Sequence, residues 1–119
     1  MDLKIHSIQN RSDQSKEYID LVATSDCDIG RYQLADSTYT AQNLVSNKLR
    51  HVFWLPDKIV KAGEYFRVFT GTGTDGTVTT PNGSVVHKIY WNLKQAVRND
   101  ASDTALLMKI EGWQQFKVT

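Results

Sequence analysis

Residues 50–70 read RHVFWLPDKIVKAGEYFRVFT, and this segment decides the fold of the chain. Two runs rich in β-branched and aromatic residues flank Pro56 and a Lys61-Ala62-Gly63 turn, which predicts a strand, a kinked connection, a turn and a second strand. Proline cannot donate to a sheet ladder, so the first strand, 52–55, must end there or lie at a sheet edge. The glycine of the turn allows a positive φ, and the second strand begins at Tyr65.

Length and composition fit one globular domain that spans residues 1–119. The net charge is +1, from 14 basic and 13 acidic side chains, so no global field attracts nucleic acid or anionic lipid. Cys27 is the single cysteine, which excludes an internal disulfide and any multi-thiolate metal site. The first residues lack the apolar core of a signal peptide, and no run reaches the ~20 apolar residues of a membrane helix. We therefore expect a cytoplasmic protein without membrane insertion.

Apolar and polar residues alternate in several other segments, as in half-buried strands. In the clearest of them Ile19, Leu21 and Ala23 share one face, so the register is well specified. The further strands are predicted at 3–8, 17–23, 32–36 and 85–91, and a closing hairpin at 104–110 and 113–118 across Glu111-Gly112. Short strands separated by turns, without a sustained helical period, predict an all-β antiparallel sandwich or barrel.

Two polar segments are predicted as loops, 37–49 and 71–84. The second contains Gly71, Gly73 and Gly76 at the spacing of a phosphate-binding loop, but no helix can follow because residues 77–81 read TVTTP. We interpret it as a long hairpin loop, with a small ribbon between Asp75-Gly76 and Asn82-Gly83. Loops of this length often carry function.

Three parts of the chain resemble the lamin-tail domain family in order and spacing. The opening pair is EYIDL at 17–21 followed by IGRYQL at 29–34. The middle is the segment 53–71, with its Pro56 and Lys61-Ala62-Gly63. The closing part is 91–107, with VRND at 97–100 and DTALL at 103–107.

The resemblance implies an immunoglobulin-like antiparallel β-sandwich of about seven to nine short strands. It also implies a non-catalytic interaction module, similar to the bacterial domains of this type that stand alone. The family's basic surface after its Trp-Gln-Ile strand is not reproduced, because Leu34-Ala35-Asp36 stands there. DNA binding is therefore not carried over. Tyr32 in place of the family's tryptophan, and Ala101-Ser102 where a glycine is usual, affect packing and turn shape.

Two groups of residues are candidates for contact with a partner. The densest basic stretch holds Lys48, Arg50, Lys58 and Lys61, with Phe53 and Trp54 between them. The long polar loop adds Thr74, Asp75 and Asn82. The plainer interpretation is that the lysines protect a strand edge from association and that Trp91, Trp113 and Phe116 pack in the core or on a sheet face.

The sequence predicts no catalytic or metal site and no cofactor. His6, His51 and His87 fall in three separate strands without a ligand-type neighbour, and no serine stands in an activated context. Asp26 and Asp28 flank Cys27 and should raise its pKa, which disfavours a nucleophile. We expect a module that binds a protein partner through a sheet edge and the 71–84 loop, and that can form a homodimer by sheet extension. A nucleic-acid-binding domain, a small metal-dependent hydrolase and a hydrolase accessory domain are the alternatives.

Overall fold

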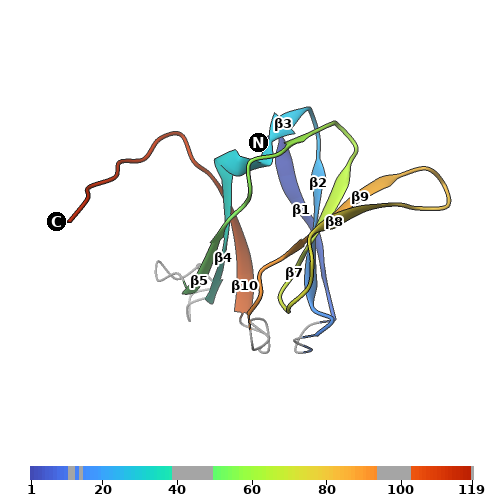
Figure 1. Cartoon of the computed structure of the whole chain (residues 1–119), viewed down its shortest axis with the longest axis horizontal. Helices are drawn as coiled ribbons and strands as arrows, with labels where there is room; N and C mark the ends of the chain where they lie inside the picture. Colours follow the sequence, from blue (N-terminus) through green and yellow to red (C-terminus); the bar gives the residue numbers. More distant parts are fainter. Residues whose placement is uncertain (11–12, 14, 39–49, 94–102, 119) are drawn as a thin grey trace.

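The computed structural model describes residues 1–10, 13, 15–38, 50–93 and 103–118 (Figure 1). Within this part of the chain there are ten β-strands and one 3-10 helix, η1. They are β1 Leu3–Gln9, β2 Tyr18–Ala23, β3 Cys27–Asp28, η1 Ile29–Arg31, β4 Tyr32–Thr38, β5 Arg50–Trp54, β6 Ile59–Val60, β7 Tyr65–Phe69, β8 Gly76–Thr79, β9 Val85–Tyr90 and β10 Asp103–Lys109.

The strands form two main sheets, which confirms the all-β, sandwich-like prediction. One sheet has five strands in the order β1-β2-β7-β9-β8, and the other has three in the order β10-β4-β5 (Figure 1). The short strands β3 and β6 pair separately. Every pair is antiparallel except β7 and β9, which run parallel because β8 lies between them in sequence and pairs with the far edge of β9. The two short strands and β8 raise the strand number above the seven to nine expected.

Alternate residues of both sheets point into one shared core. The predicted face of β2 is confirmed, because Ile19, Leu21 and Ala23 are each at most 1% exposed. On the three-stranded sheet Tyr32 and Leu34 are equally buried, and Phe53 packs against the same cluster. Each fully buried side chain of this size stabilises the fold by roughly 1.5–3 kcal/mol. The core therefore fixes which face of each strand points outward.

The segment 50–70 follows its sequence prediction with two differences: β5 spans Arg50–Trp54 instead of 52–55, and residues 59–60 of the connection form β6. Strand β5 ends at Trp54, two residues before Pro56, and within the described residues it pairs only with β4, so it is an edge strand. Gly63 has φ +85° and its N–H donates to the carbonyl of Ala23 at 2.8 Å. Strand β7 then begins at Tyr65. Pro56 and Gly63 thus help to place β5 at an edge of the three-stranded sheet and β7 in the middle of the five-stranded one.

The prediction of a small ribbon within the 71–84 loop is confirmed for its first strand, but the partner strand is β9 rather than a part of the loop. Residues 76–79 form β8, which pairs with 85–88 of β9. The connection between them is a tight turn in which Thr80 N donates to the carbonyl of Ser84 at 2.8 Å, and Gly83 has φ +86°. The β-branched Thr77, Val78 and Thr79 outweigh the neighbouring glycines because β9 offers them a hydrogen-bonding partner.

The predicted closing hairpin is also wrong in its second half. Strand β10 forms, but residues 113–118 make no strand and leave both sheets, as Figure 1 shows at the red end of the chain. Trp113, Phe116 and Val118 are 61%, 89% and 88% exposed, so neither aromatic residue packs in the core. The N–H of Ile110 donates to the carbonyl of Arg31 at 2.7 Å, which leads the chain across the end of β4 instead of back along β10. We call residues 112–118 the arm.

A helix that could cross a bilayer is missing from the residues that the structure describes. The predicted loop at 37–49 begins with the last two residues of β4 and otherwise falls outside the described residues.

Candidate functional site

Strand β5 presents apolar side chains at an open sheet edge. Val52 and Trp54 point outward and are 48% and 40% exposed. Phe53, between them, points inward and stacks on Trp91 with ring centroids 5.5 Å apart. The alternation of the strand thus leaves an apolar row on the outside of an edge whose outer backbone groups have no partner strand among the described residues.

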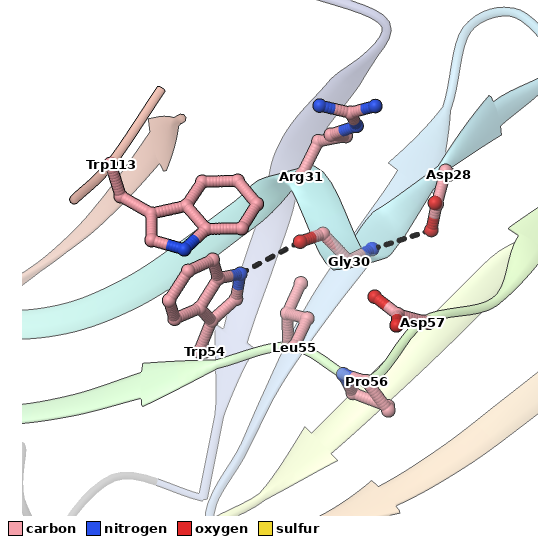
Figure 2. Close-up of a pocket in the computed structure, with 8 residues that line it drawn as sticks. All are labelled: Asp28, Gly30, Arg31, Trp54, Leu55, Pro56, Asp57 and Trp113. Carbon is pink, nitrogen blue, oxygen red and sulfur yellow. Dashed lines mark hydrogen bonds between the residues drawn. The ribbon is translucent and has the colours of Figure 1, made fainter. Parts of the chain in front are cut away.

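A groove of about 600 Å³ opens at the end of this row, where β5 passes into the connection through Pro56 (Figure 2). We call it the indole groove. Its lining residues are Asp28, Gly30, Arg31, Trp54, Leu55, Pro56, Asp57 and Trp113. The rings of Trp54 and Trp113 meet edge to face with centroids 5.1 Å apart. The indole N–H of Trp54 donates to the carbonyl of Gly30 at 2.7 Å, so this ring is held in place.

Two carboxylates line the groove opposite the indoles, with Gly30 between the two groups (Figure 2). Asp28 caps η1: its Oδ1 accepts hydrogen bonds from Gly30 N at 2.9 Å and from Lys58 N at 3.2 Å. Asp57 packs so closely on Gly30 that an added Cβ there would lie 2.1 Å from Asp57 Oδ1 and 2.9 Å from its Cα. Glycine is therefore required at position 30. The carboxylate of Asp57 is exposed, and no hydrogen bond joins it to another described side chain.

The groove combines an aromatic side with an acidic side at the end of an open strand edge. Such a surface suits an extended segment of a partner, whose backbone pairs with the edge while an apolar or cationic side chain enters the groove. The side chain of Arg31 points away from the two carboxylates in Figure 2, so it does not stand between Asp28 and Asp57.

The thiol of Cys27 lies beside the groove and is not activated. Burial raises its pKa most, and the carboxylates of Asp2, Asp28 and Asp26 raise it further. The direction expected from the flanking aspartates is thus confirmed, although burial and Asp2 contribute more than either of them. A thiol with a raised pKa is a poor nucleophile at neutral pH.

The three histidines are each held by a different partner. His6 meets the ring of Tyr65 edge to face at 5.5 Å, and His51 Nδ1 lies 3.2 Å from Asp36 Oδ2. His87 is buried between Thr77 Oγ1 at 3.2 Å and Glu64 Oε1 at 3.3 Å. Within the described residues, no three His, Cys, Asp or Glu side chains come together in a way that could hold a metal ion.

Of the basic residues predicted as contacts, Lys58 and Lys61 flank β6. Lys58 is half-buried and Lys61 is exposed. The backbone N–H of Lys61 donates to Glu64 Oε1 at 2.9 Å in the turn before β7. Arg50 is the first residue of β5, and Lys48 lies outside the described residues.

The predicted contacts of the 71–84 segment stabilise the β8–β9 hairpin. Asp75 Oδ1 accepts a hydrogen bond from Tyr90 N at 2.9 Å, and Asn82 Oδ1 accepts one from Ser84 N at 3.3 Å and one from the Thr80 hydroxyl. Thr74 is exposed just before β8. These residues flank β8 of the five-stranded sheet, whereas Arg50 is the first residue of β5 in the three-stranded sheet. Arg50 and the predicted contacts of the 71–84 segment therefore lie on different sheets.

Other residues of the groove, among them Trp113 and Asp57, were not predicted from the sequence to belong to a site. Trp113 was expected in a hairpin, and Asp57 carries no local signal because its importance comes from its approach to Gly30 across 27 positions of sequence. The one signal available was the Asp-x-Gly pattern of Asp28 and Gly30 before a strand, which is typical of a capped turn. Neither the known protein families nor the curated proteins include a match to this chain.

An aromatic row on the outer face of the five-stranded sheet is a second surface to consider. Tyr18, Phe69 and Tyr90 lie side by side on β2, β7 and β9. Their faces are occupied, because Phe69 stacks on Tyr90 at 4.9 Å, Arg67 lies 4.8 Å over Tyr18, and Gly73 packs against Tyr90. Rings that already stack on protein groups offer little to a nucleic-acid base. This row therefore contributes to packing.

Proposed function

We propose that the chain is a non-catalytic binding module of lamin-tail type, which takes an extended segment of a protein partner along β5. The apolar row of Val52 and Trp54 on an open edge is the observation that carries the proposal. Backbone hydrogen bonds to the edge supply affinity in this mode, and the indole groove selects a side chain of the partner. A chain with Cys27 as its single cysteine forms no internal disulfide, which is compatible with a cytoplasmic setting.

The β8–β9 hairpin has a structural role in this proposal. Its predicted contact residues Asp75 and Asn82 already accept backbone hydrogen bonds of their own hairpin, so their oxygens are less available to a partner. An isolated apolar residue on β8, Val78, is 41% exposed and offers a matched comparison for Val52.

The test is capture of partners by the purified protein from a lysate of its own source, at low and at high salt. We expect Val52→Lys to reduce capture of a defined protein at least tenfold, which corresponds to about 1.4 kcal/mol, because a lysine on an edge strand opposes strand addition. The matched variant Val78→Lys should leave capture unchanged.

Two outcomes of this experiment would contradict the proposal. Equal loss in both variants would place the contact elsewhere or indicate general destabilisation, which melting curves of the variants would reveal. Retention of nucleic acid alone, removed by salt, would favour the nucleic-acid alternative, against which the net charge of +1 argues.

A further inference from the structure

The arm exposes more apolar surface than any other described segment of similar length. Trp113, Phe116 and Val118 are all exposed. The backbone that carries them runs away from both sheets (Figure 1). Trp, Phe and Val are residues that favour strands. In extended form the five residues beyond Trp113 span about 17 Å, which is roughly the length of the five-residue strand β5. An exposed apolar segment of this kind indicates a contact with another molecule.

The part of the arm beyond Trp113, residues 114–118, cannot readily enter the indole groove of its own chain. Trp113 already sits there against Trp54, and the chain leaves the groove from that point. For Phe116 to reach the same groove, the backbone would have to reverse within Gln114 and Gln115. Neither residue favours a turn, and no Gly, Pro, Asn or Asp stands between Trp113 and Phe116.

We infer that the partner segment on β5 is the arm of a second copy of this chain. Each arm then lies on the β5 edge of the other copy, in a two-fold arrangement where the same surfaces meet twice. The inference rests on the proposed role of the β5 edge and names its occupant.

The charges of the two surfaces are complementary. Lys117 is the sole charged residue of the arm, and the groove holds the carboxylates of Asp28 and Asp57. Asp57 has no hydrogen-bonding partner among the described side chains, so it can meet an ammonium group without losing another contact. Phe116 beside it supplies an apolar ring for the indole of Trp54.

The first test is sedimentation of the full chain between about 1 µM and 1 mM, the range in which a small interface of this kind associates. We expect the average mass to rise from one chain toward two. Phe116→Ser should leave the chain monomeric across the range, and because Phe116 is 89% exposed the fold should be unaffected. Val78→Ser, which removes an exposed apolar residue from β8, an edge strand of the five-stranded sheet, should associate as the wild type does.

The second test is a charge exchange. Lys117→Asp alone and Asp57→Lys alone should each weaken the dimer about tenfold, and the double variant should restore most of the loss. Lys61→Asp is the control for Lys117→Asp, because it makes the same change of charge at another exposed lysine. If Asp57→Lys disturbs the fold near Gly30, the Phe116→Ser comparison still decides the question.

Three results would overturn the inference. The first is a wild-type chain that stays monomeric throughout, and the second is a dimer that survives Phe116→Ser. The third is a change of tryptophan fluorescence on Phe116→Ser that is the same at all concentrations, since this would place the arm on its own chain.

The variant Val52→Lys tests the proposed function separately, through its effect on the capture of another protein and on self-association. If the wild type does not self-associate but captures another protein in a way that Val52→Lys abolishes, the inference fails and the proposed function stands. If a dimer forms and Val52→Lys does not weaken it or any capture, both fail.

Discussion

Each main sheet has two edge strands among the described residues, β1 and β8 in one and β5 and β10 in the other. The comparison of β5 with β8 shows what an edge needs to become a binding surface. Within the described residues β5 pairs only with β4, and β8 only with β9, so both leave one side of the backbone open. Their exposed valines are similar, at 48% for Val52 and 41% for Val78. What differs is the surroundings: Val52 leads to Trp54 and a groove, whereas Val78 stands between two threonines.

The two edges are also held in place by different forces. Behind β8 the hydroxyl of Thr77 meets the buried His87, which meets Glu64, so a polar chain supports the strand. At β5 the support is apolar, with Phe53 stacked on Trp91 inside and Trp54 against Trp113 outside. The open backbone is common to β5 and β8, so the two edges differ as binding surfaces only through the side chains around them.

The largest effect expected from a single small change is that of Gly30→Ala at the β5 side. The new methyl would meet Asp57, including its backbone Cα at 2.9 Å, so the connection that forms the groove must move. We expect a loss of about 1–3 kcal/mol in the free energy of unfolding, measured by chemical denaturation, together with weaker binding at β5. Gly76→Ala on β8 is the control, because no atom lies within 4 Å of its added methyl and a change within about 0.5 kcal/mol is expected. Equal losses of unfolding free energy in Gly30→Ala and Gly76→Ala would mean that the backbone at the groove is packed no more tightly than that of β8.

A smaller effect is expected from pH, because the stability that Glu64 contributes near β8 depends on the pH and has no counterpart in the apolar support of β5. The pKa of Glu64 is lowered, first by the hydrogen bond from the Lys61 N–H and then by His87, against an opposing effect of burial. Because the folded-state pKa lies below the unfolded value, this carboxylate contributes stability above the unfolded pKa, and the contribution is lost as the pH falls through the folded one.

Glu64→Gln should therefore cost about 1 kcal/mol near neutral pH and almost nothing at a pH well below the folded-state pKa. Denaturation series at several pH values for both proteins give the comparison. In the wild type, amides of β8 should lose protection from hydrogen exchange in acid before those of β5. A uniform loss along both edges would contradict the separate polar support of β8.

The smallest effect concerns the negative charge beside the groove. Alkylation of Cys27 by iodoacetamide at slightly alkaline pH should be slower than that of an unfolded thiol, because its pKa is raised by burial and by nearby carboxylates. Asp2→Asn removes the largest of the charge effects that raise the pKa of Cys27, so it should speed the reaction. Asp13→Asn, on an exposed loop, should not. Equal rates in all three proteins would show that the carboxylates near β3 exert no such field.

The parts of the fold that the sequence predicted are those set by local chemistry. Pro56 ends β5 because it lacks an N–H, Gly63 turns because it tolerates positive φ, and Ile19 and Leu21 share a face because strand residues alternate. Each of these follows from residues within a few positions of one another.

The parts that the sequence could not predict depend on contacts distant in the chain. Strand β8 exists because β9 pairs with it, and the parallel β7–β9 pair depends on which strands meet, which no local pattern encodes. The arm has the composition of a strand, but the bond from Ile110 to Arg31 directs it away from β10. The groove was missed for the same reason, since Asp57, Gly30 and Trp113 meet only after folding.

Hydrogen exchange of the chain in its bound state, compared with the free monomer, tests the central claim most directly. Peptides that cover residues 50–57 and 76–84 report on the two edges in one measurement. If β5 and the indole groove form the binding surface, residues 50–57 gain protection and residues 76–84 stay unchanged. Protection confined to residues 76–84 would contradict the account, because it would place the partner on the β8 edge.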